Sequence, residues 1–342
     1  MMKTIRTYLL AAVLLMSTAT VFAMPEKNNR GFGVYQYVVE QAEGDLDAIL
    51  DSIKSAAGAA GWQVLADVAG GVPEGCKYRT HVLVLADSAY ADQIMQANRV
   101  TGPFAVVDRV NVFEDERGVH VSVVNPHSIN RTVLMDDEAY MEMTEAHLQK
   151  LRGMITSAVK GTVNEKEYGQ FRKKGYIGKT MGVMAGGKFI DKLVAVATVS
   201  GQGWQSVAAR VREGLSKPSA KWGMHRVYEL ALPDYRTVVF GTTGTPMDSK
   251  SFSIVRAGSD KSRKKFKCPG LAHAGAYPIE VVVAENEDGS VSVRLVETMF
   301  RMKMYFEDAG KWAFMKNMRM PGSIQKELVQ QIRSALQPMT AK

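Results

Sequence analysis

Hydrophobic and polar positions follow the same succession of periodicities twice along the chain. Each copy begins with an alternating, strand-like segment and continues with an apolar stripe at helical spacing. Two strands, a hairpin and a closing helix follow. In the first copy these features are residues 35–40, the stripe Leu46, Ile49, Leu50 and Ile53, then 62–68, 78–85, 105–113 and 119–125. In the second copy they are residues 193–199, the stripe Val207, Val211 and Leu215, then 222–232, 235–241, 279–284 and 290–296.

The offsets between matching residues support a repeat. Tyr78 and Tyr235 are 157 residues apart, the hairpin tips Gly118 and Gly289 are 171 apart, and the helix residues Leu151 and Leu328 are 177 apart. The order of elements is kept, and the first growth of the offset falls on a predicted loop near residues 259–270, where insertions are tolerated.

This pattern predicts an α+β protein of two similar modules, residues 30–160 and 191–338. Each module is expected to hold a small, mainly antiparallel sheet with helices packed on one face. Residues 161–190 are rich in Gly and Lys, and they are predicted to form a linker or a partly ordered crossing segment.

The order of elements in the first copy resembles domain-of-unknown-function family 302. The resemblance rests on a helix, a strand at Gly61-Trp62, a strand over 78–85, Gly102-Pro103, the hairpin and Asn125-Pro126, and it covers residues 34–159. Family members often carry Cys after the second of these strands and after the Pro. Here Ala86 and Phe104 stand at those places, so no thiol role is carried over. The resemblance implies a fold and no settled activity.

The first 23 residues are typical of a secretory leader. Lys3 and Arg6 precede an apolar stretch over residues 8–16, and Val21-Phe22-Ala23 suits cleavage before Met24. We therefore predict a periplasmic or secreted protein, with an uncleaved N-terminal anchor as the alternative. Removing the leader lowers the formal net charge of +8 to about +6, which is modest for this length.

The two cysteines, Cys76 and Cys268, fall in different copies. An oxidising compartment permits a disulfide between them, which would join the two modules. Because spacing in the sequence establishes no geometry, two unconnected thiols are the favoured interpretation.

Methionine is abundant, at 20 residues, and two clusters share one spacing. These are Met299, Met302, Met304 and Met315, Met318, Met320. Thioether sulfur suits Cu(I), so a Cu(I)-binding periplasmic carrier is one hypothesis, with copper as the possible cofactor; otherwise no cofactor is expected. Core packing is favoured over it, because Met318 and Met320 align with Met141 and Met143 at the entrance of the closing helix and Met commonly fills cores.

A basic segment is the second candidate site. It contains Lys261, Arg263, Lys264, Lys265 and Lys267, and Arg172, Lys173 and Lys174 form a second basic cluster. Such charges suit an anionic membrane surface or an acidic protein, although a solvated insertion is the simpler explanation. Nucleic acid is an unsuitable partner, because the net charge is modest and no aromatic residues are interleaved at stacking spacing.

No catalytic motif is present in the sequence. The six His residues show no zinc spacing, and nucleophile-elbow, phosphate-loop and dinucleotide motifs are absent. Trp62, Phe104, Trp222 and Tyr277 could line a cleft between the modules for a small apolar or amphipathic ligand, or they could be core. The prediction is a non-catalytic periplasmic or envelope binding protein, using either this cleft or the basic segment. An enzyme of unrecognised type is a further alternative.

Overall fold

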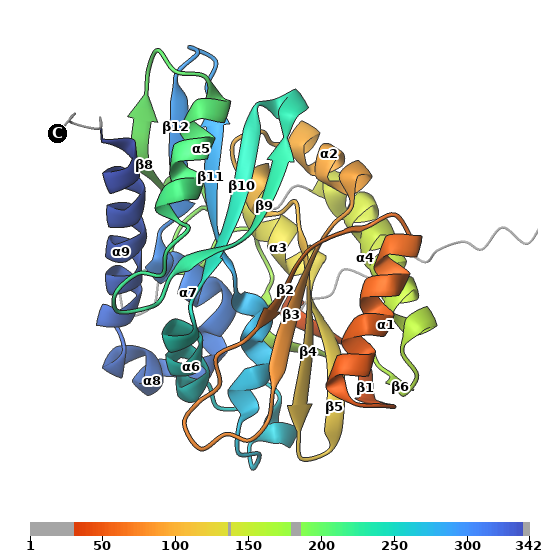
Figure 1. Ribbon diagram of the computed structural model, residues 1–342. Coiled ribbons are helices and arrows are strands. Elements are labelled where there is room, and N and C mark those ends of the chain that lie inside the picture. Colours follow the sequence, from red (N-terminus) through yellow and green to blue (C-terminus); the bar gives the residue numbers. More distant parts are fainter. Residues whose placement is uncertain (1–30, 136–137, 179–185, 338–342) are drawn as a thin grey trace, which may run out of the picture.

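A computed structural model describes residues 31–135, 138–178 and 186–337 of the chain. The predicted leader, residues 1–23, lies outside the described residues. The molecule contains two antiparallel sheets, with some helices on its two outer sides and others near its middle (Figure 1). The α+β fold class is confirmed.

The first sheet is built from the first half of the chain and has the strand order β2-β3-β4-β5-β1, with the short strands β6 and β7 pairing with β1. Its strands are β1 (Phe32–Ala42), β2 (Gln63–Ala69), β3 (Thr80–Ala86), β4 (Asp108–Asp115), β5 (Gly118–Val124), β6 (Thr162–Val163) and β7 (Glu167–Arg172). The helices of this half are α1 (Leu46–Ala59), α2 (Ser88–Ala97), α3 (Pro126–Val133) and α4 (Met141–Ala158).

The second sheet has the order β9-β10-β11-β12-β8, which is the order of the first sheet with each strand replaced by its counterpart. Its strands are β8 (Leu193–Val199), β9 (His225–Leu232), β10 (Thr237–Thr243), β11 (Ile279–Glu285) and β12 (Val291–Val296). The helices of this half are α5 (Trp204–Gly214), α6 (Thr245–Ile254), α7 (Thr298–Phe306), α8 (Lys311–Lys316) and α9 (Arg319–Leu336). The two sheets therefore fit a two-module arrangement.

Local sequence explains the elements that hold the first sheet. The Asp45 side chain caps α1 by accepting a hydrogen bond from the Ala48 backbone N–H at 2.8 Å. The buried stripe of α1 packs with Leu151 and Ile155 of α4 on one face of the sheet. Truncating a fully buried residue of this cluster, such as Leu151→Ala, is expected to cost about 2–5 kcal/mol. At the β4–β5 turn, Gly118 has a φ of +125°, which glycine adopts without strain.

The opposite face of each sheet is covered by a segment from the other half. The 3₁₀ helix η6 (Pro269–Ala276) packs against β3, β4 and β5. In return, the 3₁₀ helix η1 (Gly102–Phe104), which follows α2, packs against β10 and β11. The larger buried apolar cluster accordingly contains residues from both halves. The halves are interlocked rather than loosely connected.

The segment over residues 161–190 differs from a simple linker. Strand β7 pairs antiparallel with β1, where Tyr35 lies opposite Tyr168, and the Tyr168 side chain is buried. The sequence did not show this because few positions there are apolar. Residues 179–185 of this predicted segment lie outside the described residues. Within the part of the chain that the structure describes, no helix is long and apolar enough to span a membrane.

Candidate functional site

A pocket of about 440 Å³ lies between the outer strands of the two sheets, β2 and β9. Its volume is in the range of pockets that hold small molecules. It is lined by Ala66, Asp67, Val68, Ala69, His225, Arg226, Val227, Thr243, Thr245 and Asp248. The pocket is therefore lined by residues from both halves of the chain.

Asp248 is the deepest charged group of the pocket, with 2% of its surface exposed. It lies in the first turn of α6. Its carboxylate accepts hydrogen bonds from the Thr243 hydroxyl at 2.7 Å and from the Gly71 backbone N–H at 3.4 Å. Burial raises the pKa of Asp248 to about 7, because the charged form loses its hydration. At neutral pH this carboxyl group can therefore either accept or donate a hydrogen bond.

Gly71 allows the chain after β2 to approach α6. A Cβ atom at this position would lie 2.2 Å from the Thr245 backbone oxygen, so a larger residue would force the two segments apart. This close approach brings the Gly71 N–H to Asp248. A glycine in the first half thus donates a hydrogen bond to the acid that comes from the second half.

The rim of the pocket carries three further polar side chains. His225 Nδ1 is 2.9 Å from the Gly223 carbonyl oxygen, so Nδ1 donates and Nε2 is left to accept. Arg226 has no hydrogen-bond partner for Nε. Asp67 is hydrogen-bonded to His81 and to Lys54, and the His81 hydrogen bond is the main cause that lowers the pKa of Asp67. The site offers donors and acceptors beside apolar Ala and Val side chains.

The predicted aromatic lining is wrong for this pocket, because all four aromatic residues are buried in the core and none lines it. The Trp62 Nε1–H donates to Asp108 at 3.0 Å, and the Trp222 Nε1–H donates to the Ser323 hydroxyl at 3.0 Å. Tyr277 shares a hydrogen bond of 2.6 Å with Ser251, and Phe104 packs edge-on against Phe189. The alternative, core packing, describes them correctly.

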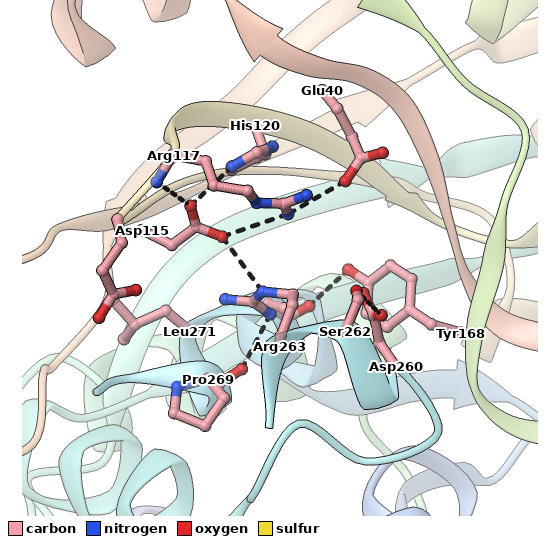
Figure 2. Close-up of polar contacts among 12 residues, drawn as sticks. Glu40, Asp115, Arg117, His120, Tyr168, Asp260, Ser262, Arg263, Pro269 and Leu271 are labelled. Atoms are coloured by element: carbon pink, nitrogen blue, oxygen red, sulfur yellow. Dashed lines mark hydrogen bonds and ion pairs between the residues drawn. The ribbon is translucent and has the colours of Figure 1, made fainter. Parts of the chain in front are cut away.

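The basic segment divides into two kinds of residue. Lys261, Lys264, Lys265 and Lys267 are exposed, whereas Arg263 is 1% exposed. Arg263 Nε donates to Asp115 at 3.2 Å (Figure 2). The guanidinium group lies over the Phe113 ring at 4.9 Å from its centroid. The prediction that Arg263 is available to an anionic surface is therefore wrong, because it is the internal partner of a buried carboxylate.

Asp115 is the centre of the polar cluster in Figure 2. His120 Nδ1 accepts from the Gln41 backbone N–H, so its Nε2–H donates to Asp115, at 2.9 Å. Burial alone would raise the pKa of Asp115, but the His120 hydrogen bond, the Arg117 backbone N–H and the charge of Arg263 together lower it to about 2. A nearby carboxylate, Asp260, accepts from Tyr37 at 3.0 Å and from Lys166 at 2.7 Å. These contacts fix the segment that carries the exposed lysines.

Five of the six methionines in the two clusters lie on helices. Met299, Met302 and Met304 lie on α7, Met315 lies on α8, Met318 directly precedes α9 and Met320 is in its first turn. Met304 and Met320 are buried members of the core, and Met302 packs against it. Met315 is 40% exposed. Among the described residues, no group of three or more His, Cys, Asp or Glu side chains could hold a metal ion.

Cys76 and Cys268 form a disulfide, with their Cα atoms 6.1 Å apart. The expectation of two unconnected thiols is therefore wrong. Packing of η6 on the first sheet brings Cys268, the residue before this helix, to the loop after β2 that carries Cys76. The two cysteines are 192 residues apart in sequence, which is why spacing alone could not pair them.

The sequence pattern did not indicate the polar residues of the pocket. Asp248 and Thr243 belong to the second half, and their partner Gly71 belongs to the first, so no local motif joins them. The only local signal was Pro246 followed by Asp248, which is typical of a helix start. It would have indicated α6 but not the pocket.

Comparisons with known proteins are limited to the fold. No protein family matches the sequence, and no curated protein matches it. Among solved structures, the chain is similar to an uncharacterized conserved protein, DUF302, from Bacillus stearothermophilus. The identity is 12% and the TM-score 0.32, over 36% of this chain and 98% of that one. At this TM-score neither the family nor an activity of this chain follows from the match.

Proposed function

We propose that this protein is a non-catalytic binding protein that holds a small amphipathic molecule in the pocket between β2 and β9. The observation that carries the proposal is the buried Asp248 carboxyl group at the floor of a pocket shared by both halves. Ala66, Val68, Ala69 and Val227 provide apolar contact. A perturbed carboxyl group in a concave site is typical of functional sites.

The two strands that border the pocket, β2 and β9, could bind a ligand through their backbone N–H and C=O groups. Among the described residues, β2 pairs only with β3, and β9 pairs only with β10. The outer edge of a sheet presents backbone N–H and C=O groups that can bind an added partner. A ligand with both polar and apolar parts would use these groups together with the Arg226 side chain, which lines the pocket and pairs with Glu229 at 3.5 Å.

The proposal includes export and duplication. The Cys76–Cys268 disulfide supports an oxidising compartment, as the predicted leader does. The equal strand order of the two sheets supports an origin from two copies of one module. On this basis the ligand would be met in the periplasm or outside the cell.

Native mass spectrometry of protein purified from its host tests the proposal. We expect an additional small-molecule mass on the unmodified protein. Ala69→Trp should fill the pocket and remove that mass, because Ala69 lines it at an exposed strand edge. Ala59→Trp, at an exposed position of α1, is the matched control and should keep it. Retention of the mass by a folded Ala69→Trp variant, or its absence from the unmodified protein, would contradict the proposal.

A further inference from the structure

The 3₁₀ helix η7 (Glu307–Ala309) connects three exposed segments that are distant from one another in the sequence. Two of them follow residues that bind η7, and the third follows η7 along the chain. Glu307 accepts from the Arg172 guanidinium group at 2.8 Å, and Lys173 and Lys174 follow directly. Asp308 accepts from the Ser259 backbone N–H at 3.1 Å, two residues before Lys261. Helix α8 follows η7 after Gly310. We call residues 173–176, 261–267 and 312–319 together the cationic face.

The charges on this face are positive and unpaired. Lys173, Lys174, Lys264, Lys265 and Lys316 are exposed, and none has an ion-pair partner among the described residues. Arg263 does not contribute, because Asp115 neutralises it internally. The acids at the centre are also occupied, since Glu307 is paired with Arg172 and Asp308 with His273. The face therefore presents free positive charge to a partner.

Exposed apolar side chains lie within the same face. Trp312 on α8 is 76% exposed, and Met315, three residues later on the same side of the helix, is 40% exposed. Tyr176 is 54% exposed, with the Lys174 ammonium group 5.9 Å from its ring centroid. In Figure 1, α8 and the cyan segment after α6 lie at the same lower end of the molecule.

We propose that the cationic face docks on an anionic lipid bilayer. Tryptophan and tyrosine favour the headgroup region, and lysines reach anionic headgroups while their stems remain on apolar surface. Anionic lipids diffuse within the bilayer, so their headgroups can reach lysines from three separate segments. A folded acidic protein would instead need a carboxylate at a fixed position for each of these lysines. Trp312 and Met315 would enter the interface while Lys174 and Lys265 hold the headgroups. The face shares no residue with the lining of the pocket, so the proposal does not depend on the ligand.

Flotation with lipid vesicles tests this docking. The purified protein should bind vesicles of phosphatidylcholine containing about one third phosphatidylglycerol, and binding should be lost at roughly 1 M salt. Lys174→Glu and Lys265→Glu should each weaken partitioning about fivefold or more, since each basic residue near the surface contributes about a fivefold factor. Trp312→Ser should weaken it by a similar factor.

Two substitutions outside the cationic face serve as matched controls. Lys160→Glu is an exposed charge reversal between α4 and β6, and Val163→Ser removes an apolar side chain that is 60% exposed on β6. Both should bind as the unmodified protein does, with unchanged near-ultraviolet circular dichroism in every variant. Equal losses in control and test variants, equal binding to pure phosphatidylcholine, or no vesicle binding would overturn the proposal. The last result would leave an acidic protein as the partner of this face.

Discussion

Arg109 and Glu280 occupy matching positions in the two sheets and form an ion pair with each other at 3.3 Å. Arg109 of β4 lies opposite Val84 of β3, and Glu280 of β11 lies opposite Gly241 of β10. These pairs have the same offsets, 157 and 171 residues, that relate the two halves of the sequence. Arg301 contacts the same carboxylate at 3.2 Å, so one buried acid serves two buried guanidinium groups at the junction of the sheets.

Removing this acid should destabilise the protein strongly. Glu280→Gln leaves Arg109 and Arg301 as two uncompensated buried charges, and the expected loss is about 3–5 kcal/mol of unfolding free energy. Urea unfolding followed by tryptophan fluorescence measures it. Glu285→Gln is the control on the same strand, because its partner Arg236 is exposed, and it should cost about 1 kcal/mol or less. Equal losses would show that Glu280 does not hold the two halves together.

The sequence predicted helix α1 because one of its sides is buried and the other is exposed, whereas strands such as β10 and β11 are buried on both sides. The stripe of α1 and the strand β8 are where the periodicity placed them. Helix α7 escaped detection, because buried residues lie on all its sides and no amphipathic period remains. The pocket could not be predicted either. Its walls come from the edges of two sheets, and Asp248 depends on a contact with Gly71 that is 177 residues distant in sequence.

The Cys76–Cys268 disulfide should stabilise the packing of η6 on the first sheet. It closes a span of 192 residues, and loss of a native disulfide typically costs about 2–5 kcal/mol. Unfolding in urea should therefore shift to lower denaturant on reduction. A double variant, Cys76→Ser with Cys268→Ser, should unfold as the reduced protein does and show no response to reductant. If oxidised and reduced protein unfold together, the bridge does not stabilise this contact.

Arg263 and Lys264 are neighbours with opposite expected roles. Arg263→Gln should destabilise the protein by about 2–4 kcal/mol, because Asp115 loses a charged partner in a buried site and the guanidinium group no longer stacks on Phe113. Lys264→Gln should change stability by about 0.5 kcal/mol or less, since the side chain is exposed. Thermal unfolding of both variants measures the difference. Similar midpoints for the two variants would contradict the buried role of Arg263.

The buried carboxyl group of Asp248 should make stability depend on pH. In the folded protein its pKa is raised to about 7, whereas the unfolded chain ionises near pH 4. Between these values the folded state holds a proton that the unfolded state has released. The stabilisation from this group is therefore complete below about pH 4 and is lost as pH rises through 7, by up to about 4 kcal/mol.

Asp248→Asn removes this titration and keeps one oxygen, which can accept from the Thr243 hydroxyl, while the Gly71 N–H, which donates to the other carboxylate oxygen, loses its acceptor. Its unfolding free energy should exceed that of the unmodified protein increasingly as the pH is raised from 5 to 8. Urea unfolding at several pH values in this range, with the exposed Asp234→Asn as the control, measures the two slopes. A common slope for all three proteins would mean that Asp248 is ionised throughout. In that case a charged acid lies at the floor of the pocket at every pH tested, and the pocket would favour a cationic ligand.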